Sequence, residues 1–168
     1  MSSYSVDCHN RRVLETLRVL LVDLKATIPT KAHSNDAGFD LYSCEEKIIE
    51  PHTRALISTG IKLSIPLGYY GRIAPRSGMS VKGYDIGAGV IDYGFEDVIK
   101  VLLINNSNNV LIVEPKHRIA QLVIEKIYTG EIEQVASDKE IEECRLLTKQ
   151  IYPNSSSRGL GGFGSSGV

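Results

Sequence analysis

The sequence predicts an all-β protein, built as a sandwich, a barrel or a jelly roll. Short runs rich in β-branched and aromatic residues recur about every ten residues, and clusters of Gly, Pro, Asn and Ser separate them. The pattern contains no strand–helix–strand alternation, which disfavours a Rossmann-type sheet. With 168 residues and 42% hydrophobic composition, the chain can bury a core in one domain, or two at most.

Each predicted strand is a β-rich run that stops at a turn signal. Proline lacks a backbone donor and glycine loses the most freedom on folding, so the clusters at 28–30, 34–36, 65–68 and 105–109 interrupt strands. The predicted strands, in chain order, are Leu17–Leu24, Ala37–Tyr42, Lys47–Ile49, Ala55–Leu63, Tyr69–Ala74, Asp85–Ile91, Val98–Asn105, Val110–Val113 and Ile119–Ile127.

One segment, 137–150, carries a helix signal. Ser137 and Glu140 have the spacing of a capping box, and the first turn is acidic. The polar stretch 152–157 that follows predicts a flexible linker. We therefore expect a loose N-terminal extension (1–16), a β domain (17–136), an insertion with its linker (137–157) and a C-terminal arm (158–168).

Composition excludes several classes of function. The formal net charge is −1, whereas a general nucleic-acid binder carries a basic excess, so we expect no stable nucleic-acid binding. No apolar run approaches the roughly 20 residues that span a bilayer, and the N-terminus lacks the regions of a signal peptide. The three cysteines, Cys8, Cys44 and Cys144, form no CxxC pair. These features predict a cytoplasmic or nuclear protein with free thiols and no membrane contact.

The arm contains five of the fifteen glycines in the chain, together with Arg158 and Phe163. A segment this rich in glycine neither nucleates a helix nor holds a strand, because each glycine loses much backbone freedom on folding. We therefore expect the arm to be mobile until a ligand orders it. A cation and an aromatic ring suit the phosphate and the base of a nucleotide. The alternative is an unstructured terminus with no function.

Four further stretches place polar residues in the predicted β pattern. They are Ala37-Gly-Phe-Asp40-Leu, Ala74-Pro-Arg76-Ser77-Gly78, Gly89-Val-Ile-Asp92 and Arg118-Ile-Ala-Gln121-Leu. Each has a structural alternative: a strand aspartate caps a turn or pairs with an arginine, Pro-Arg-Ser-Gly forms a type I turn, and a strand glutamine faces solvent.

Taken in order with the arm, the five stretches resemble the five motifs of the trimeric dUTP pyrophosphatases (dUTPases). The similarity runs from about Leu17 to the C-terminus, excluding roughly 138–157. It implies a distorted jelly-roll β-barrel, a homotrimer with active sites shared between subunits, and Mg²⁺-dependent hydrolysis of dUTP to dUMP and pyrophosphate. This activity limits uracil incorporation into DNA and supplies dUMP for dTMP synthesis.

The resemblance also assigns roles to residues. Asp92 matches the catalytic aspartate that orients water, and Asp40, Arg76 and Gln121 complete the catalytic set. Mg²⁺ prefers oxygen ligands and sits on the triphosphate in this family. We therefore expect no direct protein ligand to the metal, with Asp40 acting through water or pairing with Arg118. The implied substrate-binding residues are Arg76, Ser77, Gly78, Gly89, Asp92, Phe95, Lys100, Gln121, Arg158, Phe163 and Gly164.

Within this set, a tight hairpin from Gly89 to Lys100 is expected to offer backbone groups to uracil. Phe95 takes the place of a tyrosine that stacks on deoxyribose, and Phe163 is expected to cover the base.

The chain departs from the family pattern at several positions. Glu96-Asp97 replaces the usual Arg-Gly, and Lys116-His117-Arg118 replaces the usual Gly-Asp-Arg. The insertion 138–157 is longer than the usual link. These departures leave two alternatives. One is a catalytically weak trimer of this fold that binds a protein partner when nucleotide is bound. The other is the related dCTP deaminase, which has a catalytic glutamate near the third motif, where this chain has Asp92.

Overall fold

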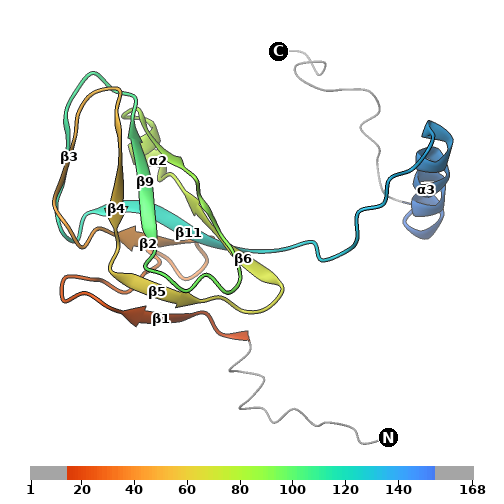
Figure 1. The fold of residues 1–168 in the computed structure, drawn as a ribbon, viewed down its shortest axis with the longest axis horizontal. Coiled ribbons are helices and arrows are strands. Elements are labelled where there is room, and N and C mark those ends of the chain that lie inside the picture. The colour runs from red at the N-terminus through yellow and green to blue at the C-terminus, as the bar shows by residue number, and fades with distance from the viewer. Residues whose placement is uncertain (1–14, 154–168) are drawn as a thin grey trace, which may run out of the picture. The chain divides into compact units, whose positions relative to one another are not determined.

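The computed structural model describes residues 15–153, so the expected arm with Arg158, Phe163 and Gly164 lies outside the described residues. The chain divides into two units, Met1–Thr129 and Gly130–Val168. The described part of the first unit contains every strand, and that of the second contains one helix (Figure 1). This architecture confirms the all-β prediction.

Four antiparallel sheets make up the first unit. The largest has the order β2-β11-β6-β8, the next β4-β9-β7, and two pairs are β1-β5 and β10-β3. The strands are β1 (Arg18–Leu21), β2 (Gly38–Tyr42), β3 (Lys47–Ile49), β4 (Arg54–Ser58), β5 (Ile61–Ser64), β6 (Tyr69–Ala74), β7 (Tyr84–Gly87), β8 (Val90–Ile91), β9 (Lys100–Asn105), β10 (Leu111–Val113) and β11 (Arg118–Lys126).

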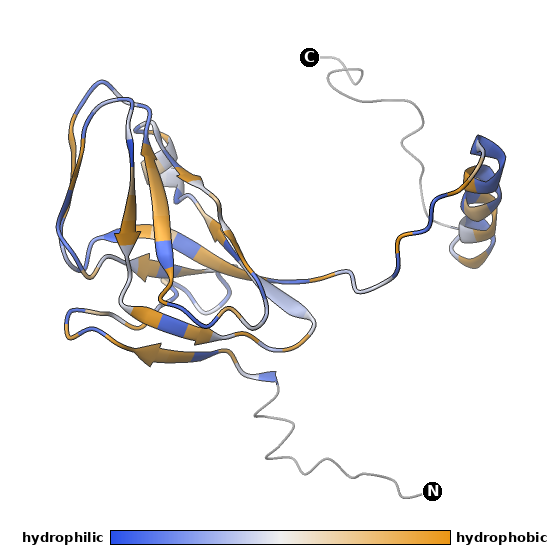
Figure 2. Ribbon diagram, in the orientation of Figure 1, coloured by the Kyte–Doolittle hydropathy of each residue, from blue (hydrophilic) through white to orange (hydrophobic). Residues whose placement is uncertain are grey.

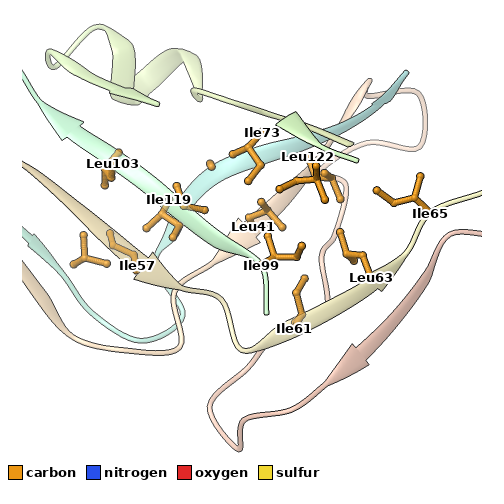
Figure 3. Close-up of a cluster of buried hydrophobic side chains, with 14 of the residues drawn as sticks. Leu41, Ile57, Ile61, Leu63, Ile65, Ile73, Ile99, Leu103, Ile119 and Leu122 are labelled. Atoms are coloured by element: carbon orange, nitrogen blue, oxygen red, sulfur yellow. The ribbon is translucent and has the colours of Figure 1, made fainter. Parts of the chain in front are cut away.

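The core consists of aliphatic side chains supplied by strands from different sheets. In β9, buried and partly exposed residues alternate, as expected for a strand with one face against a core. Figure 3 shows Leu41 of β2, Ile73 of β6 and Leu122 of β11 gathered with Ile61 of β5 and Leu103 of β9. The largest sheet is thereby fixed on one face, and its other face is left to carry polar side chains.

Two predicted strands are each divided in two by left-handed backbone. The expected strand Ala55–Leu63 breaks at Gly60, whose φ is 66°, and a Cβ there would lie 2.7 Å from the Cβ of Asp23. The expected strand Asp85–Ile91 breaks at Ala88, whose φ is 47°. The hydrophobic pattern predicts neither break, because the residues on each side of Gly60 and of Ala88 remain apolar.

The expected tight hairpin from Gly89 to Lys100 is wrong. In the described residues, β8 pairs with β6 and β9 pairs with β4 and β7, so the two strands belong to different sheets. The connection between them is a loop, residues 92–99, that crosses from one sheet to the other. It contains a turn in which the N–H of Phe95 donates to the carbonyl of Asp92 over 3.1 Å.

The Pro-Arg-Ser-Gly stretch forms a short helix, α2 (Ser77–Ser80), rather than only a turn. Arg76 is the N-cap with extended backbone, and its carbonyl accepts hydrogen bonds from the N–H groups of Met79 and Ser80. The helix begins directly after β6 and Pro75, so it projects Arg76 and Ser77 from the end of a core strand.

The second unit confirms the predicted helix, α3 (Asp138–Ile151), with Ser137 as its N-cap. The Ser137 hydroxyl donates to the carboxylate of Glu140 over 3.2 Å instead of accepting a backbone N–H. Figure 2 shows hydrophobic and hydrophilic residues interspersed along α3, and none of its residues is buried. No helix within residues 15–153 has the length and apolar composition needed to cross a membrane.

Candidate active site

Strand register places two of the sequence-predicted residues side by side on the largest sheet. Gln121 of β11 lies opposite Asp40 of β2 and opposite Ala74 of β6. Residues directly opposite each other in an antiparallel sheet share a face. Ala74 is followed by Pro75 and then Arg76, so motifs far apart in the sequence converge at this edge.

A cavity of about 400 Å³ opens at this point. We call it the phosphate cavity, after the ligand that the sequence predicts for its residues. It brings together five of the sequence-predicted site residues, Asp40, Arg76, Ser77, Gly78 and Gln121, with Arg118. Its remaining lining residues are Ala32, Asp36, Ala37 and Gly38.

Asp40 holds the two arginines of the phosphate cavity. The Arg76 Nε lies 2.8 Å from Asp40 Oδ1, and the Arg118 Nη1 lies 3.3 Å from Asp40 Oδ2. The Asp40 side chain is only 15% exposed, and a carboxylate so deeply placed requires paired charges. Arg76 also donates from Nη1 to the carbonyl of Arg118 over 3.3 Å. These bonds fix the orientation of both guanidinium groups, and the expected Asp40–Arg118 pair is present.

Gln121 is fixed by a backbone contact and a close approach. Its Nε2 donates to the carbonyl of Pro75 over 2.9 Å. A Cβ at Gly38 would lie 2.5 Å from Gln121 Oε1, so only glycine leaves room for the amide at this position. The close approach of Gln121, in the fourth motif, thus explains why glycine occupies position 38 in the first motif.

Ser77 and Gly78 form the exposed first turn of α2. A Cβ built on Gly78 would meet no atom within 4 Å. The space above this backbone is therefore open, and a bound anion can approach it closely. The side chains and backbone of this edge together offer several donors to one anionic ligand.

Among the described residues, the other sequence-predicted site residues do not line the phosphate cavity. Asp92 is exposed and follows β8, and within the described chain it does not line that cavity. Phe95 is 42% exposed and lines a different cavity, of about 520 Å³, with residues of β1 and β5. Lys100 is exposed at the start of β9, opposite Ser58. One chain thus presents its candidate site in two separate parts.

Gly89 precedes β8 and fixes the backbone that leads to Asp92, in the part of the candidate site outside the phosphate cavity. Its carbonyl accepts the N–H of Ile73 over 2.7 Å, and an added Cβ would lie 2.4 Å from the Ile73 carbonyl oxygen. No side chain fits at that distance. Gly89 therefore sets the path of the backbone into β8 and on to Asp92.

Sequence analysis missed Asp36 as a residue of the phosphate cavity. The Ser34-Asn35-Asp36 cluster predicts only a turn, and Asp36 does accept the N–H of His33 over 2.8 Å. The other feature of the sequence that pointed to Asp36 as a site residue is its position four residues before Asp40. No group of three or more His, Cys, Asp or Glu side chains suited to a metal ion occurs in the part of the chain that the structure describes.

A second ion cluster lies farther along the same sheet face. Arg72 donates to both carboxylate oxygens of Glu125 over 2.9 and 2.8 Å, and the Tyr70 hydroxyl donates to Glu125 over 2.5 Å. Glu125 is four residues from Gln121 in β11, so the two side chains share a face. Hydrogen bonds from Arg72 and Tyr70 lower the pKa of Glu125 to about 2.

Comparisons with known proteins identify relatives over almost the whole chain. The family model described as dUTPase matches residues 24–167. The deoxyuridine 5'-triphosphate nucleotidohydrolase of Yarrowia lipolytica is 42% identical over 154 residues, covering 91% of this chain and 90% of that protein. The cowpox virus protein of the same name is 41% identical over 159 residues, covering 95% and 98%.

Solved structures give the same relationship. The dUTPase of Staphylococcus bacteriophage 80alpha, with dUPNHPP, matches with a TM-score of 0.73 and 32% identity, covering 91% of this chain and 99% of that one. A mutant dUTPase from phage phi11 of S. aureus, described as coordinating a structural Mg(II) ion, matches with a TM-score of 0.68 and 31% identity. It covers 73% of this chain and 97% of that one.

Proposed function

The chain belongs to the dUTPase family and is a dUTP diphosphatase, and from this premise we propose a division of its catalytic work between two parts of the chain. The phosphate cavity binds the triphosphate, and Asp92 orients the attacking water. The observation that carries this assignment is the set of fixed donors around Asp40, in which two arginines are held at 2.8 and 3.3 Å.

In the proposed reaction the oxygen of a water molecule attacks the α-phosphorus of dUTP. The bond between that phosphorus and the α–β bridging oxygen breaks, and pyrophosphate leaves while dUMP remains. Asp92 accepts a hydrogen bond from the water and takes up its proton as the new bond forms. General-base assistance of this kind contributes about 10²–10⁴ in rate.

The phosphate cavity supplies positioning and charge. Arg76 offers forked donors suited to phosphate oxygens, and Ser77 and the Gly78 backbone lie open beside it. Because Asp40 and the Pro75 carbonyl already orient Arg76 and Gln121, these donors need little rearrangement when substrate binds. Preorganised donors of this kind stabilise the charge that develops during transfer.

Mg²⁺ bound to the substrate phosphates would neutralise charge along the triphosphate. The residues present fit such an ion held by the substrate: both Asp40 oxygens are engaged by arginines, which leaves that carboxylate suited to a water-mediated contact. Asp36, at the rim of the same cavity, is a second carboxylate for this purpose. The Mg(II) ion described for the phage phi11 dUTPase is a structural ion, so it supports metal binding by a relative and not the proposed position on the triphosphate.

The separation of Asp92 from the phosphate cavity supports a homotrimer with shared sites. One chain does not bring the water-orienting carboxylate to its own phosphate donors, so Asp92 of one subunit serves the cavity of a neighbour. Symmetric assemblies can build such sites because each interface repeats around the ring. Phe95 and the backbone of loop 92–99 then contact deoxyribose and uracil from the same subunit as Asp92.

The remaining assignments follow the family pattern. The β domain spans 17–136, with the insertion at 137–157 and an arm at 158–168 whose Arg158, Phe163 and Gly164 close over the nucleotide. The reaction limits uracil incorporation into DNA and supplies dUMP for dTMP synthesis.

A single assay tests this function. Purified protein is incubated with Mg²⁺ and either dUTP or dCTP, and pyrophosphate and ammonia are measured. We expect pyrophosphate from dUTP only. Ammonia from dCTP would indicate a deaminase, and neither product would indicate a nucleotide-binding module without turnover; either result contradicts the proposal.

A further inference from the structure

A second cavity, of about 510 Å³, adjoins the phosphate cavity and shares three of its residues, Arg76, Gly78 and Arg118. We call it the lysine cavity. To the shared arginines it adds Lys82, Lys116 and His117. Its remaining lining residues are Met79, Tyr84, Leu111, Ile112, Val113 and Ile119.

Lys116 occupies a backbone position that favours glycine. The His117 N–H donates to the Glu114 carbonyl over 3.0 Å, which closes a turn with Pro115 and Lys116 at its centre. The φ of Lys116 is 72°, as required at the third position of a type II turn, where glycine is preferred. Backbone held in this region against the preference of its side chain often accompanies a functional site.

The turn is held at both ends. Lys116 donates its N–H to the Ser43 carbonyl over 2.7 Å, and the Ser43 N–H donates to the His117 carbonyl over 2.9 Å. These bonds tie the turn to the residue that follows β2, so its backbone cannot relax to suit the lysine. The backbone of Lys116 is thereby held at the lysine cavity, which this residue lines.

The charges of the lysine cavity have one sign. No carboxylate is among its lining residues within the described chain. His117 is engaged by Glu114, whose N–H donates to Nδ1 over 3.1 Å and whose Oε2 lies 3.3 Å from Nε2. Arg76 and Arg118 are engaged by Asp40. Lys82 and Lys116 are both exposed and supply the cavity's further positive charge.

We propose that the lysine cavity is a second phosphoanion subsite, which binds inorganic pyrophosphate with Lys82, Lys116 and Arg76. The inference rests on the proposed function, because pyrophosphate is the product released in the neighbouring cavity. Arg76 and Gly78 border both spaces, so the leaving anion can move between them while Arg76 still contacts it. Compact polyanions suit several point charges, and lysine ammonium groups bind phosphate in that way.

The chain offers a matched pair of variants for the test. Lys116→Gly removes the charge and gives the turn its preferred residue. His52→Gly likewise gives the preferred residue to the turn Glu50-Pro51-His52-Thr53, where φ is 58° and the Thr53 N–H donates to the Glu50 carbonyl. It also removes the exposed hydrogen bond of 3.0 Å between His52 Nε2 and Asn108 Oδ1. His52 does not line either cavity. Both variants are expected to keep or raise the thermal midpoint, so a loss of binding in K116G alone reflects the lost charge.

Binding of inorganic pyrophosphate to the full chain is measured by calorimetry, with and without saturating dUPNHPP. We expect wild-type protein and H52G to bind pyrophosphate in both conditions. K116G is expected to bind about fivefold more weakly with the analogue present, as for one partly exposed charge pair. K82A is expected to weaken binding in the same direction.

Equal pyrophosphate affinity of K116G and H52G would overturn the subsite, as would complete loss of pyrophosphate binding when dUPNHPP is saturating. A failure of the proposed function would be seen in a different measurement, the hydrolysis of dUTP, which wild-type protein would then not catalyse. In that case weaker pyrophosphate binding by K116G than by H52G would still establish the subsite.

Discussion

The phosphate cavity and loop 92–99 differ in how their residues are held. In the cavity, Asp40, Arg76 and Arg118 orient one another through ion pairs at the edge of a core sheet. Residues 92–97 of the loop are exposed, while Ile99 at its end is buried. A turn from Asp92 to Phe95 shapes the loop, and Gly89 sets the path of the backbone into the preceding strand β8. Charge positioning is thus built into the sheet, while Asp92, the proposed water-orienting residue, lies on a connection between sheets. In the proposed trimer, the two parts complement each other across separate chains.

Loss of the Asp92 carboxylate is expected to have the largest effect. Asp92→Asn keeps the size of the side chain but removes the base, so turnover should fall by about 10²–10⁴ while dUPNHPP still binds. Pyrophosphate release gives the rate, and calorimetry gives the affinity. Asp97→Asn in the same loop is the control, because within the described residues its Oδ1 accepts the N–H of Val98. Turnover at the wild-type rate in D92N would remove Asp92 from the mechanism.

Alanine substitutions at Gly78, in the phosphate cavity, and at Gly89, before β8, are expected to separate an effect on catalysis from an effect on stability. Gly78→Ala adds a methyl in open space, so stability should change by less than about 0.5 kcal/mol while kcat/KM falls about tenfold, since the methyl obstructs the anion. Gly89→Ala places its methyl against the Ile73 carbonyl and should cost about 1–3 kcal/mol of stability. Thermal unfolding and steady-state kinetics distinguish them. A strongly destabilised G78A would contradict the open space above α2.

Acid stability should depend on the ion cluster beyond the cavity. The pKa of Glu125 in the folded protein is lowered to about 2 by Arg72 and Tyr70, so its contribution is present above the ordinary value of 4.5 and is lost as pH falls toward 2. Glu125→Gln should therefore be less stable than wild type at pH 7, and the gap should narrow between pH 4.5 and 2. Denaturant unfolding at several pH values measures it.

The control for this comparison is Glu143→Gln on the exposed helix α3, where the carboxylate lies 3.9 Å from Lys139. Its unfolding profile should follow wild type across the same range. A gap between E125Q and wild type that stays constant from pH 7 to pH 2 would show that Glu125 contributes by packing and not by charge.

Sequence reasoning located the strands and α3 well, because hydrophobic pattern and capping residues act locally. It did not find the breaks at Gly60 and Ala88, since a change of φ within an apolar run leaves no mark on the pattern. The helix α2 was also missed, because its four residues carry no periodicity.

The candidate site was only partly accessible from sequence. The Asp40–Arg118 pair was expected, and the structure places both residues in one cavity. The resemblance implied sites shared between subunits, but the sequence did not show which motifs lie apart in one chain, because this depends on β8 and β9 joining different sheets. Asp36 was missed because its turn-forming role is the same whether or not a cavity lies beside it.

Sharing of the site between subunits is tested most directly by mixing two inactive variants. R76A chains lack a phosphate donor and D92N chains lack the water-orienting carboxylate. With different affinity tags, assemblies containing both chains can be purified and assayed for dUTP hydrolysis. A trimer whose sites combine one subunit's cavity with a neighbour's Asp92 should regain about one third of wild-type turnover, because one site in three is intact. Mixed assemblies as inactive as the parent variants would contradict the account, since each chain would then complete its own site.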